Sequence, residues 1–231
     1  MKIYSISDLH LTSGTDKPMD IFGENWVGHW DKIRVDWNRK VTDEDVVLIA
    51  GDVSWGMNTE QAITDLREID ELPGKKIIIR GNHDYWWSTY KKLCALDLKS
   101  IIFIQNNAKT VGEYVFCGTR GWTVPEKNEQ TEEDKKIFDR ELIRLKMSLD
   151  EARKIADGKE IIGLIHYPPF NSKFEKSPFS DLFSEAGVKT VVYGHLHGTH
   201  VRTKEGAVNI DGVNYFLTSC DFLDFKIFEL K

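Results

Sequence analysis

A run of β-branched residues followed by a glycine and a short polar loop recurs along this sequence, and the repetition restricts the fold more than any other feature. The clearest case is the stretch 75–84, in which the apolar run ends at Gly81 and is followed by Asn82, His83 and Asp84. Such a run predicts a buried strand, and loops at the carboxyl ends of strands are where open α/β sheets keep their chemistry. Taken alone, the loop is equally a glycine-asparagine turn with solvated side chains.

Four other predicted strands end in side chains of the same kind. These side chains are Asp8 and His10 after residues 2–7, Asp52 after 46–50, His166 after 161–165, and His195 and His197 after 190–193. Together with His83, five of the seven histidines in the chain lie at strand exits. Histidines placed for packing would have no reason to gather there, so the pattern predicts one shared site built from five loops.

The predicted site combines four imidazoles, two carboxylates and one amide, with no thiolate. This mixture of nitrogen and oxygen ligands is typical of manganese, iron or zinc, whereas magnesium prefers a shell of oxygens alone. Seven ligands exceed the need of one ion, so we expect two divalent transition-metal ions that share a bridging carboxylate. Two ions about 3.5–4 Å apart can clamp the attacking and leaving oxygens of a phosphoryl transfer and lower the pKa of a bound water from 15.7 towards about 7.

Taken in chain order, these motifs resemble the signature of the calcineurin-like metallophosphoesterases. The matching blocks, which span residues 8–197, are Asp8-x-His10, Gly51-Asp52, Gly81-Asn82-His83-Asp84, His166 and Gly194-His195-x-His197. The resemblance implies an α/β fold, a four-layer αββα sandwich of mixed sheets with a dinuclear metal site at the strand ends. It also implies hydrolysis of a phosphomonoester or phosphodiester, in which a metal-bridging hydroxide attacks phosphorus in line.

The resemblance also implies a role for each residue of the site. The first metal would be held by Asp8, His10 and His197, and the second by Asn82, His166 and His195, with Asp52 bridging the two. His83 would be a proton donor that does not bind metal, oriented by Asp84. One position departs from the family pattern: many members continue the second block to Gly-Asp-x-x-Asp or Gly-Asp-x-x-Arg, whereas this chain has Trp55 there. That position is not a metal ligand in the family, so the departure bears on the substrate.

The complete ligand set and the presence of His83 favour an enzyme over a non-catalytic scaffold of the same fold, such as the retromer subunit that resembles this family. A DNA-repair-type nuclease is the third alternative. Such relatives usually carry an added DNA-capping domain and a basic surface, and a chain of 231 residues with a net charge of −6 shows neither. The charge gives no support to a general nucleic-acid binder, although it leaves room for a local basic groove. We therefore expect a small phosphorylated substrate.

Aromatic residues surround the predicted ligands. They are Trp55, Tyr85, Trp86, Trp87, Tyr167 and Phe170. Aromatic rings beside a phosphate site can stack on a base or another planar group. The alternative is that Trp86 and Trp87 begin a helix and are buried in the core. The candidate phosphate contacts outside the ligand set are Arg120, His200 and Arg202.

The segments between the site motifs predict helices and further strands. An apolar stripe from Phe22 to Trp37 predicts one helix, with His29 beside it as a structural residue. Thr59 is the predicted cap of a second helix, and Thr131 begins a long helix that ends at Gly158. Further strands are predicted at 101–105, 114–118, 213–218 and 225–230. Strands separated by helices favour parallel pairing early in the chain, and closely spaced strands favour antiparallel pairing later.

No linker, repeat or low-complexity segment interrupts residues 1–231, so we expect a single domain. The odd number and scattered positions of Cys94, Cys117 and Cys220 predict buried free thiols in a reducing compartment. The sequence shows no signal segment at its start, and no apolar run approaches the roughly 18 residues that a membrane span needs. These features predict a cytoplasmic protein without a membrane partner, and they leave its oligomeric state open.

Overall fold

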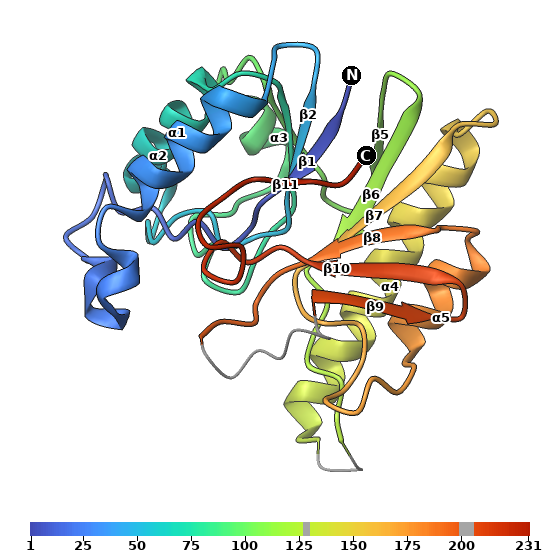
Figure 1. The fold of residues 1–231 in the computed structure, drawn as a ribbon. Coiled ribbons are helices and arrows are strands. Elements are labelled where there is room, and N and C mark those ends of the chain that lie inside the picture. The colour runs from blue at the N-terminus through green and yellow to red at the C-terminus, as the bar shows by residue number, and fades with distance from the viewer. Residues whose placement is uncertain (127–129, 199–205) are drawn as a thin grey trace.

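The computed structural model describes residues 1–126, 130–198 and 206–231, and it contains two mixed β-sheets (Figure 1). The first sheet has the strand order β11-β1-β2-β3-β4. Its strands are β1 (Ile3–Ser5), β2 (Val46–Ile49), β3 (Lys75–Ile78), β4 (Ile101–Phe103) and β11 (Phe228–Glu229). Strands β1 to β4 are parallel, and β11 pairs antiparallel with β1 at the edge. The parallel pairing predicted for the early strands is therefore confirmed.

The second sheet has the strand order β5-β6-β7-β8-β10-β9. Its strands are β5 (Ala108–Val111), β6 (Tyr114–Thr119), β7 (Glu160–Ile165), β8 (Thr190–Tyr193), β9 (Ala207–Ile210) and β10 (Val213–Leu217). The four inner strands are parallel, and the edge strands β5 and β9 are antiparallel to their neighbours. The carboxyl ends of the inner strands of both sheets therefore carry the loops that the sequence analysis singles out.

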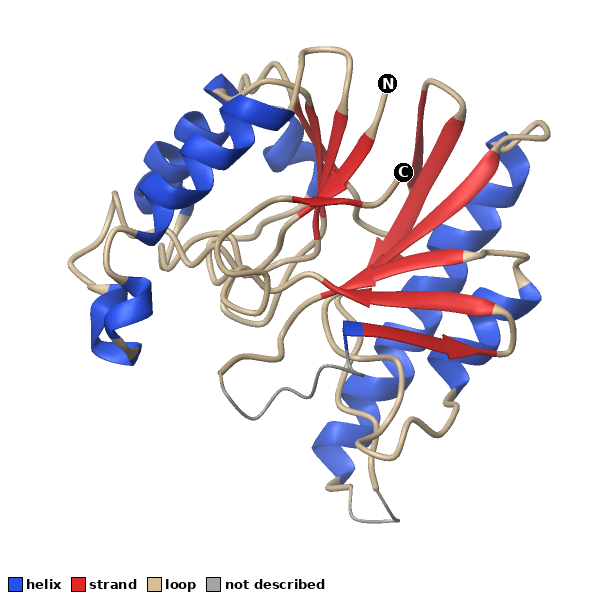
Figure 2. Ribbon diagram, in the orientation of Figure 1, coloured by secondary structure: helices blue, strands red, loops and turns tan. Residues whose placement is uncertain are grey.

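Helices cover the outer face of each sheet, as Figure 2 shows. The helices over the first sheet are α1 (His29–Lys40), α2 (Thr59–Glu71) and α3 (Tyr90–Cys94), and those over the second are α4 (Glu132–Ile155) and α5 (Pro178–Glu185). Side chains alternate between the layers: Val46 and Leu48 of β2 lie between the sheets, whereas Val47 and Ile49 face the helices. Both faces of these strands are buried, which explains their uninterrupted apolar runs. The predicted four-layer αββα sandwich is confirmed.

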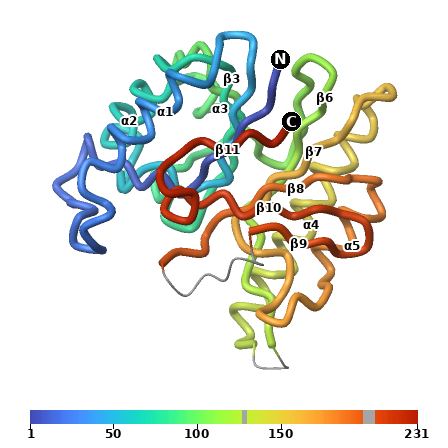
Figure 3. Tube along the Cα trace, in the orientation of Figure 1, coloured from blue at the N-terminus to red at the C-terminus, as the bar shows by residue number. Residues whose placement is uncertain are grey.

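Closely spaced strands are not the antiparallel partners that the sequence predicts. Residues 101–105 and 114–118 contribute to different sheets, and so do residues 213–218 and 225–230. The antiparallel partners are the edge strands β5 and β9, which the sequence analysis misses. Both are short and partly exposed, so they lack the continuous apolar run that marks the buried strands. The chain instead crosses between sheets after β10, which places β11 beside β1 from the opposite end of the sequence (Figure 3).

The apolar stripe from Phe22 to Trp37 does not form one helix. Its first part is two 3-10 turns, η1 (Met19–Phe22) and η2 (Glu24–Trp26), and α1 begins only at His29. Gly23 and Gly28 have φ values of 140° and 61°, so the helical path is broken at both glycines. Within α1 the pattern is correct, because Ile33 and Trp37 are fully buried.

The helix caps are partly as predicted. Thr131 caps α4, since its hydroxyl accepts a hydrogen bond from the backbone N–H of Asp134, and α4 packs against β6 through its apolar face. Thr59 is not a cap: the side chain of Asn58 accepts from Gln61 N, and Thr59 is the first helical residue of α2. Asn58 and Thr59 are both common at helix starts, and only the backbone geometry distinguishes them.

All three cysteines are free, and Cys117 and Cys220 are buried as predicted. Cys94 is exposed, contrary to the prediction, because it ends the short helix α3, in which Leu93 is the buried residue. Among the described residues, none of the helices is both long enough and apolar enough to cross a bilayer.

Candidate metal centre

The loops after β1, β2 and β8 hold four predicted ligands in an unusual backbone conformation. Asp8, His10, Asp52 and His195 have φ values of 57°, 46°, 53° and 73°. Residues other than glycine rarely adopt this left-handed backbone conformation, and those that do cluster at functional sites. The backbone therefore turns sharply as it leaves each of these strands, and the turn directs the ligand-type side chain across the end of the sheet.

Two glycines make room for the carboxylates. A Cβ at Gly81 would collide with Asp52, and a Cβ at Gly194 would collide with Asp8. The glycines of the motifs 81–84 and 194–197 are thus required by the close approach of a neighbouring carboxylate rather than by a turn alone.

The structure brings together the first predicted ligand group, Asp8, His10 and His197. The Nε2 atoms of His10 and His197 are 3.3 Å apart, and His197 Nε2 is 3.4 Å from Asp8 Oδ1. Their potential ligand atoms lie within 4.8 Å of one another, close enough to share one ion. Asp8 and His10 are buried, whereas the side chain of His197 is 31% exposed.

The second group forms around Asn82. Its Oδ1 lies 2.6 Å from His166 Nε2 and 2.9 Å from His195 Nδ1. Asp52 connects the two groups, because its Oδ2 is 3.5 Å from His166 Nε2 and 3.8 Å from His10 Nε2. Its other oxygen is fixed by the backbone N–H of His83 at 2.8 Å. All seven predicted ligands therefore converge, with Asp52 between the groups.

Neighbouring groups fix which nitrogen of each histidine faces the centre. His166 Nδ1 lies 2.8 Å from the carbonyl oxygen of Ala50, which can only accept, so this nitrogen carries the proton and Nε2 offers its lone pair. His197 Nδ1 contacts Asp221 Oδ1 at 2.8 Å in the same way. Partners of this kind orient metal-binding histidines and make them better ligands. With the proton on Nδ1, His166 Nε2 and Asn82 Oδ1 are both acceptors, yet the two atoms lie only 2.6 Å apart. A proton or a cation shared between them would stabilise this contact.

Asp221 is a site residue that the sequence analysis misses. It follows β10, which is thus a sixth strand that ends in polar residues of the site. Ser219, in the same loop, donates a hydrogen bond to Asp8 Oδ2 at 2.9 Å. The residues after 213–218 carry the same signal as the other strand exits, but without a histidine or a glycine to mark them.

Charge and burial set the protonation of the cluster. Burial lowers the pKa of His10 and that of His195 to about 3, so both imidazoles are neutral and can bind a metal. Burial opposes protonation of His197 as well, but Asp221 and Asp8 raise its pKa to about 10, so His197 must release a proton when it binds a metal. Burial raises the pKa of Asp52 to about 7. Imidazoles, carboxylates and an amide oxygen in one cluster fit divalent transition metals.

Asp84 does not orient His83, contrary to the sequence prediction. Its buried carboxylate accepts hydrogen bonds from the backbone N–H groups of Asp52, Val53 and Gly81, and from Trp86 Nε1. These donors satisfy the carboxylate, so Asp84 ties the loop after β3 to the loop after β2. Within the described chain, His83 Nδ1 is buried without a hydrogen-bond partner.

The aromatic residues near the site divide into three groups. Trp86 and Trp87 are buried against Phe103, so the core interpretation is correct for them, although α3 begins only at Tyr90. Two others contact site histidines: Trp55 stacks on His10 with ring centroids 5.0 Å apart, and the ring of Tyr167 lies 4.1 Å from that of His195. The remaining two are Phe170, which is buried with the second-sheet helices, and Tyr85, which is half exposed.

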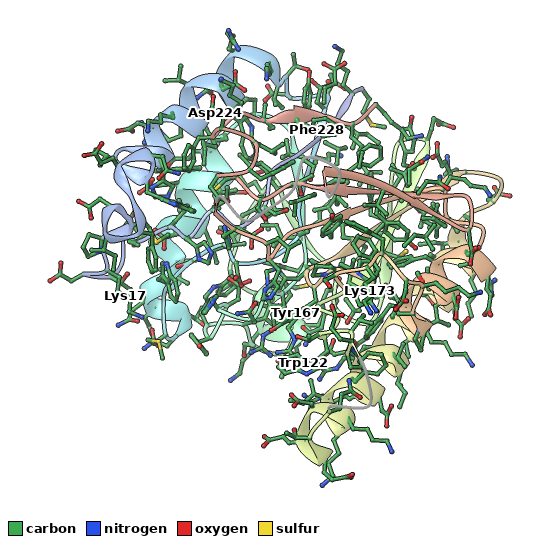
Figure 4. The ribbon with its side chains drawn as sticks, turned by 60° about the horizontal axis from the view of Figure 1, so that its bottom comes forward. Lys17, Trp122, Tyr167, Lys173, Asp224 and Phe228 are labelled. Carbon is green, nitrogen blue, oxygen red and sulfur yellow. The ribbon has the colours of Figure 1, made fainter. Side chains whose placement is uncertain are left out.

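The predicted phosphate contacts receive no support from the described residues. Arg120 Nη2 lies 3.3 Å from Glu141 Oε1, and its guanidinium covers the ring of Trp122. Figure 4 labels Trp122 beside Tyr167, and their ring centroids are 5.1 Å apart. Arg120 is therefore committed to a buried ion pair with α4. His200 and Arg202 lie outside the described residues.

Residues 1–199 match the family model of the calcineurin-like phosphoesterases. The chain belongs to this family. Calcineurin-like phosphoesterases are generally hydrolases that bind divalent metals, and the candidate ligands here are the groups around Asp8, His10, Asp52 and His166.

Two solved structures are similar to the chain at low sequence identity. A protein of unknown function from Aquifex aeolicus has a TM-score of 0.50 at 15% identity, over 98% of this chain and 94% of that one. A purple acid phosphatase from yellow lupin seeds has a TM-score of 0.43 at 13% identity, over 94% of this chain and 43% of that one. Among curated proteins, none matches the chain.

Proposed function

We propose that this calcineurin-like phosphoesterase hydrolyses a small phosphomonoester or phosphodiester with two divalent transition-metal ions, manganese, iron or zinc. The observation that carries the proposal is the position of Asp52, whose Oδ2 faces His10 Nε2 on one side and His166 Nε2 on the other. A carboxylate placed in this way suits two ions that share it. When bound, such ions would make water a stronger nucleophile and neutralise charge on the phosphoryl oxygens.

The ligand roles follow the two groups. The first ion would be held by Asp8, His10 and His197, and the second by Asn82, His166 and His195, with Asp52 common to both. Asp221 would keep the Nε2 lone pair of His197 directed at the first ion, and the carbonyl of Ala50 would do the same for His166.

His83 is the residue that favours an enzyme over a non-catalytic scaffold. Its ring lies 5.7 Å from that of His10 and 4.6 Å from that of Trp55, and it lines a cavity beside the ligands. An imidazole that lines this cavity beside the ligands suits proton transfer to a substrate. In the enzyme, His83 would give a proton to the departing alcohol oxygen, while Asp84 would hold the two adjoining loops together.

Metal analysis and activity together test the proposal. The protein is stripped with a chelator, reloaded with manganese, iron or zinc, and assayed on a panel of phosphomonoesters and phosphodiesters. We expect two ions per chain by elemental analysis and turnover that returns only on reloading. The Asp52→Asn variant should lose both ions and turnover. The control is Asp36→Asn, which should keep the ions, because the buried carboxylate of Asp36 lies away from the proposed ligands and accepts a hydrogen bond from Ile227 N. Full activity with one ion per chain would contradict the dinuclear proposal.

A further inference from the structure

A cavity of about 800 Å³ adjoins the candidate metal centre. Its lining includes His10, His83 and His197 of the centre, together with the large side chains of Met19, Trp55 and Phe222. This volume is far larger than a phosphate group needs and lies within the range of about 300–1,000 Å³ typical of pockets for small organic ligands. The part of the substrate that it holds is therefore the organic group attached to the phosphate.

Apart from the histidines, the described lining is mainly apolar. None of the described residues that line the cavity is a lysine or an arginine, so these residues offer no such cation to a second phosphate group. Asp221 is occupied by His197 Nδ1 and the backbone N–H of Gly198. Outside the centre, the side-chain amide of Asn25 is the polar group of the described lining that remains to recognise a sugar or the edge of a base.

The indole rings of the wall already have partners. Trp55 stacks on His10, the ammonium of Lys17 lies 5.2 Å from its ring centroid, and its Nε1 donates to the sulfur of Met19. Lys17 is labelled at the left of Figure 4. Trp26 packs against His29 and Phe225. Stacking on a nucleobase would have to displace these contacts, whereas an alkyl chain needs no free ring face.

A further observation points to an apolar ligand. At the opening, η1 exposes 61% of Phe22, which lines the cavity, and 73% of its neighbour Ile21. Large apolar side chains left exposed next to a cavity mark a binding surface.

We propose that the cavity binds the leaving alcohol of the substrate, and that this alcohol is apolar, an alkyl or aryl alkyl group. The inference rests on the proposed function. His83 lines the same cavity, which places the departing oxygen on this side of the centre. In the reaction the oxygen of water bonds to phosphorus as the ester P–O bond breaks. One proton of the water replaces the proton that His83 gives to the alcohol. The products are a neutral apolar alcohol and either phosphate, from a monoester, or a phosphomonoester, from a diester.

A series of leaving groups tests the inference. The metal-loaded protein is assayed on monoalkyl phosphates and on methyl alkyl phosphodiesters from ethyl to octyl, whose alkanols have nearly the same reactivity. Burial of each methylene should raise kcat/KM by up to about fourfold. A flat or falling series would overturn the apolar pocket and leave the proposed function intact, whereas no hydrolysis of any ester would count against the function.

Binding gives a measurement that does not depend on turnover. Alkylphosphonates of the same lengths are titrated into the metal-loaded protein by calorimetry, and affinity should rise with chain length in the same proportion. Equal affinities for ethyl- and octylphosphonate would contradict the inference even in an inactive preparation.

An exposed residue of the cavity supplies the variant, because it cannot unfold the core. Phe22→Ser should lower the octyl-to-ethyl ratio of kcat/KM by roughly threefold, since it removes part of an apolar contact. Val35→Ser is the matched control: Val35 is 71% exposed on α1 and does not line this cavity. Its ratio should equal that of the unchanged protein. Equal ratios in both variants would show that the chain does not pass Phe22.

Discussion

The two sheets contribute different chemistry to the metal centre. On the oxygen side, the loops after β1, β2 and β3 carry every candidate oxygen ligand, from Asp8, Asp52 and Asn82, together with one imidazole. On the nitrogen side, the loops after β7 and β8 carry imidazoles only, from His166, His195 and His197. The oxygen side includes both candidate carboxylates, whereas on the nitrogen side Ala50 and Asp221 set the orientation of His166 and His197. The candidate centre therefore depends on loops from both sheets.

The oxygen side should be the more sensitive to mutation. Asp52→Asn removes the charge that both ions share, and we expect a loss of turnover of roughly 10³-fold, since several kcal/mol of charge stabilisation are involved and each 1.36 kcal/mol is tenfold. His10→Ala affects one ion and should cost about tenfold less. Turnover and metal content are measured on both variants. Retention of both ions and a near-normal rate in Asp52→Asn would show that the bridge is elsewhere.

His83 belongs to the oxygen side by sequence but binds no metal in the proposal. His83→Ala should keep both ions and lose about 10²–10⁴-fold on alkyl phosphoesters, the usual contribution of a general acid. Nitrophenyl esters should lose far less, because nitrophenolate departs as a stable anion. Equal losses on the two substrate classes would exclude the acid role, and loss of metal would make His83 a ligand.

The nitrogen side depends on its orienting partners. Asp221→Asn keeps the size of the side chain but weakens the acceptor that fixes His197 Nδ1, so metal affinity should fall about 10–100-fold. The change should appear in the first ion and spare the second. Titration of chelator-stripped protein with manganese measures it, and Asp211→Asn, on an exposed turn of the second sheet, is the control. An unchanged affinity would show that His197 needs no partner.

The outer helix of the second sheet should matter least. Lys136, Asp139 and Lys146 are exposed on α4, and their replacement by alanine should leave turnover within about twofold, since isolated surface charges contribute little. Glu141→Gln is the contrasting variant, because Glu141 is buried and holds Thr119 and Arg120 beside the loop of His166. A large loss from the exposed positions would mean that α4 reaches the substrate.

Local patterns explain which parts of this molecule are predictable from its sequence. The buried strands and the loops of Asp52 and Asn82 are recognisable because an apolar run, a glycine and a ligand-type residue are adjacent in sequence. The role of Asp84 is not, because its partners are backbone N–H groups that any residue would offer. Asp221 is missed because it lacks such a neighbour pattern, and the break before α1 is missed because the stripe of apolar residues continues across Gly23 and Gly28.

The pairing of β1 with β11 has a consequence for the order of events during synthesis. Asp8 and His10 are made well before the residues that hold their strand, since Ser7 is held by backbone hydrogen bonds with Thr218 and Cys220, and Ile3 with Leu230. Contacts between residues so far apart in sequence form late, because a long loop must close before they are made. When only the parallel strands of the first sheet have left the ribosome, the edge of β1 that pairs with β11 is therefore unpaired. The loop of Asp8 and His10 is then not yet held in place. The proposed centre would then be complete only after the residues of β8, β10 and β11 have emerged.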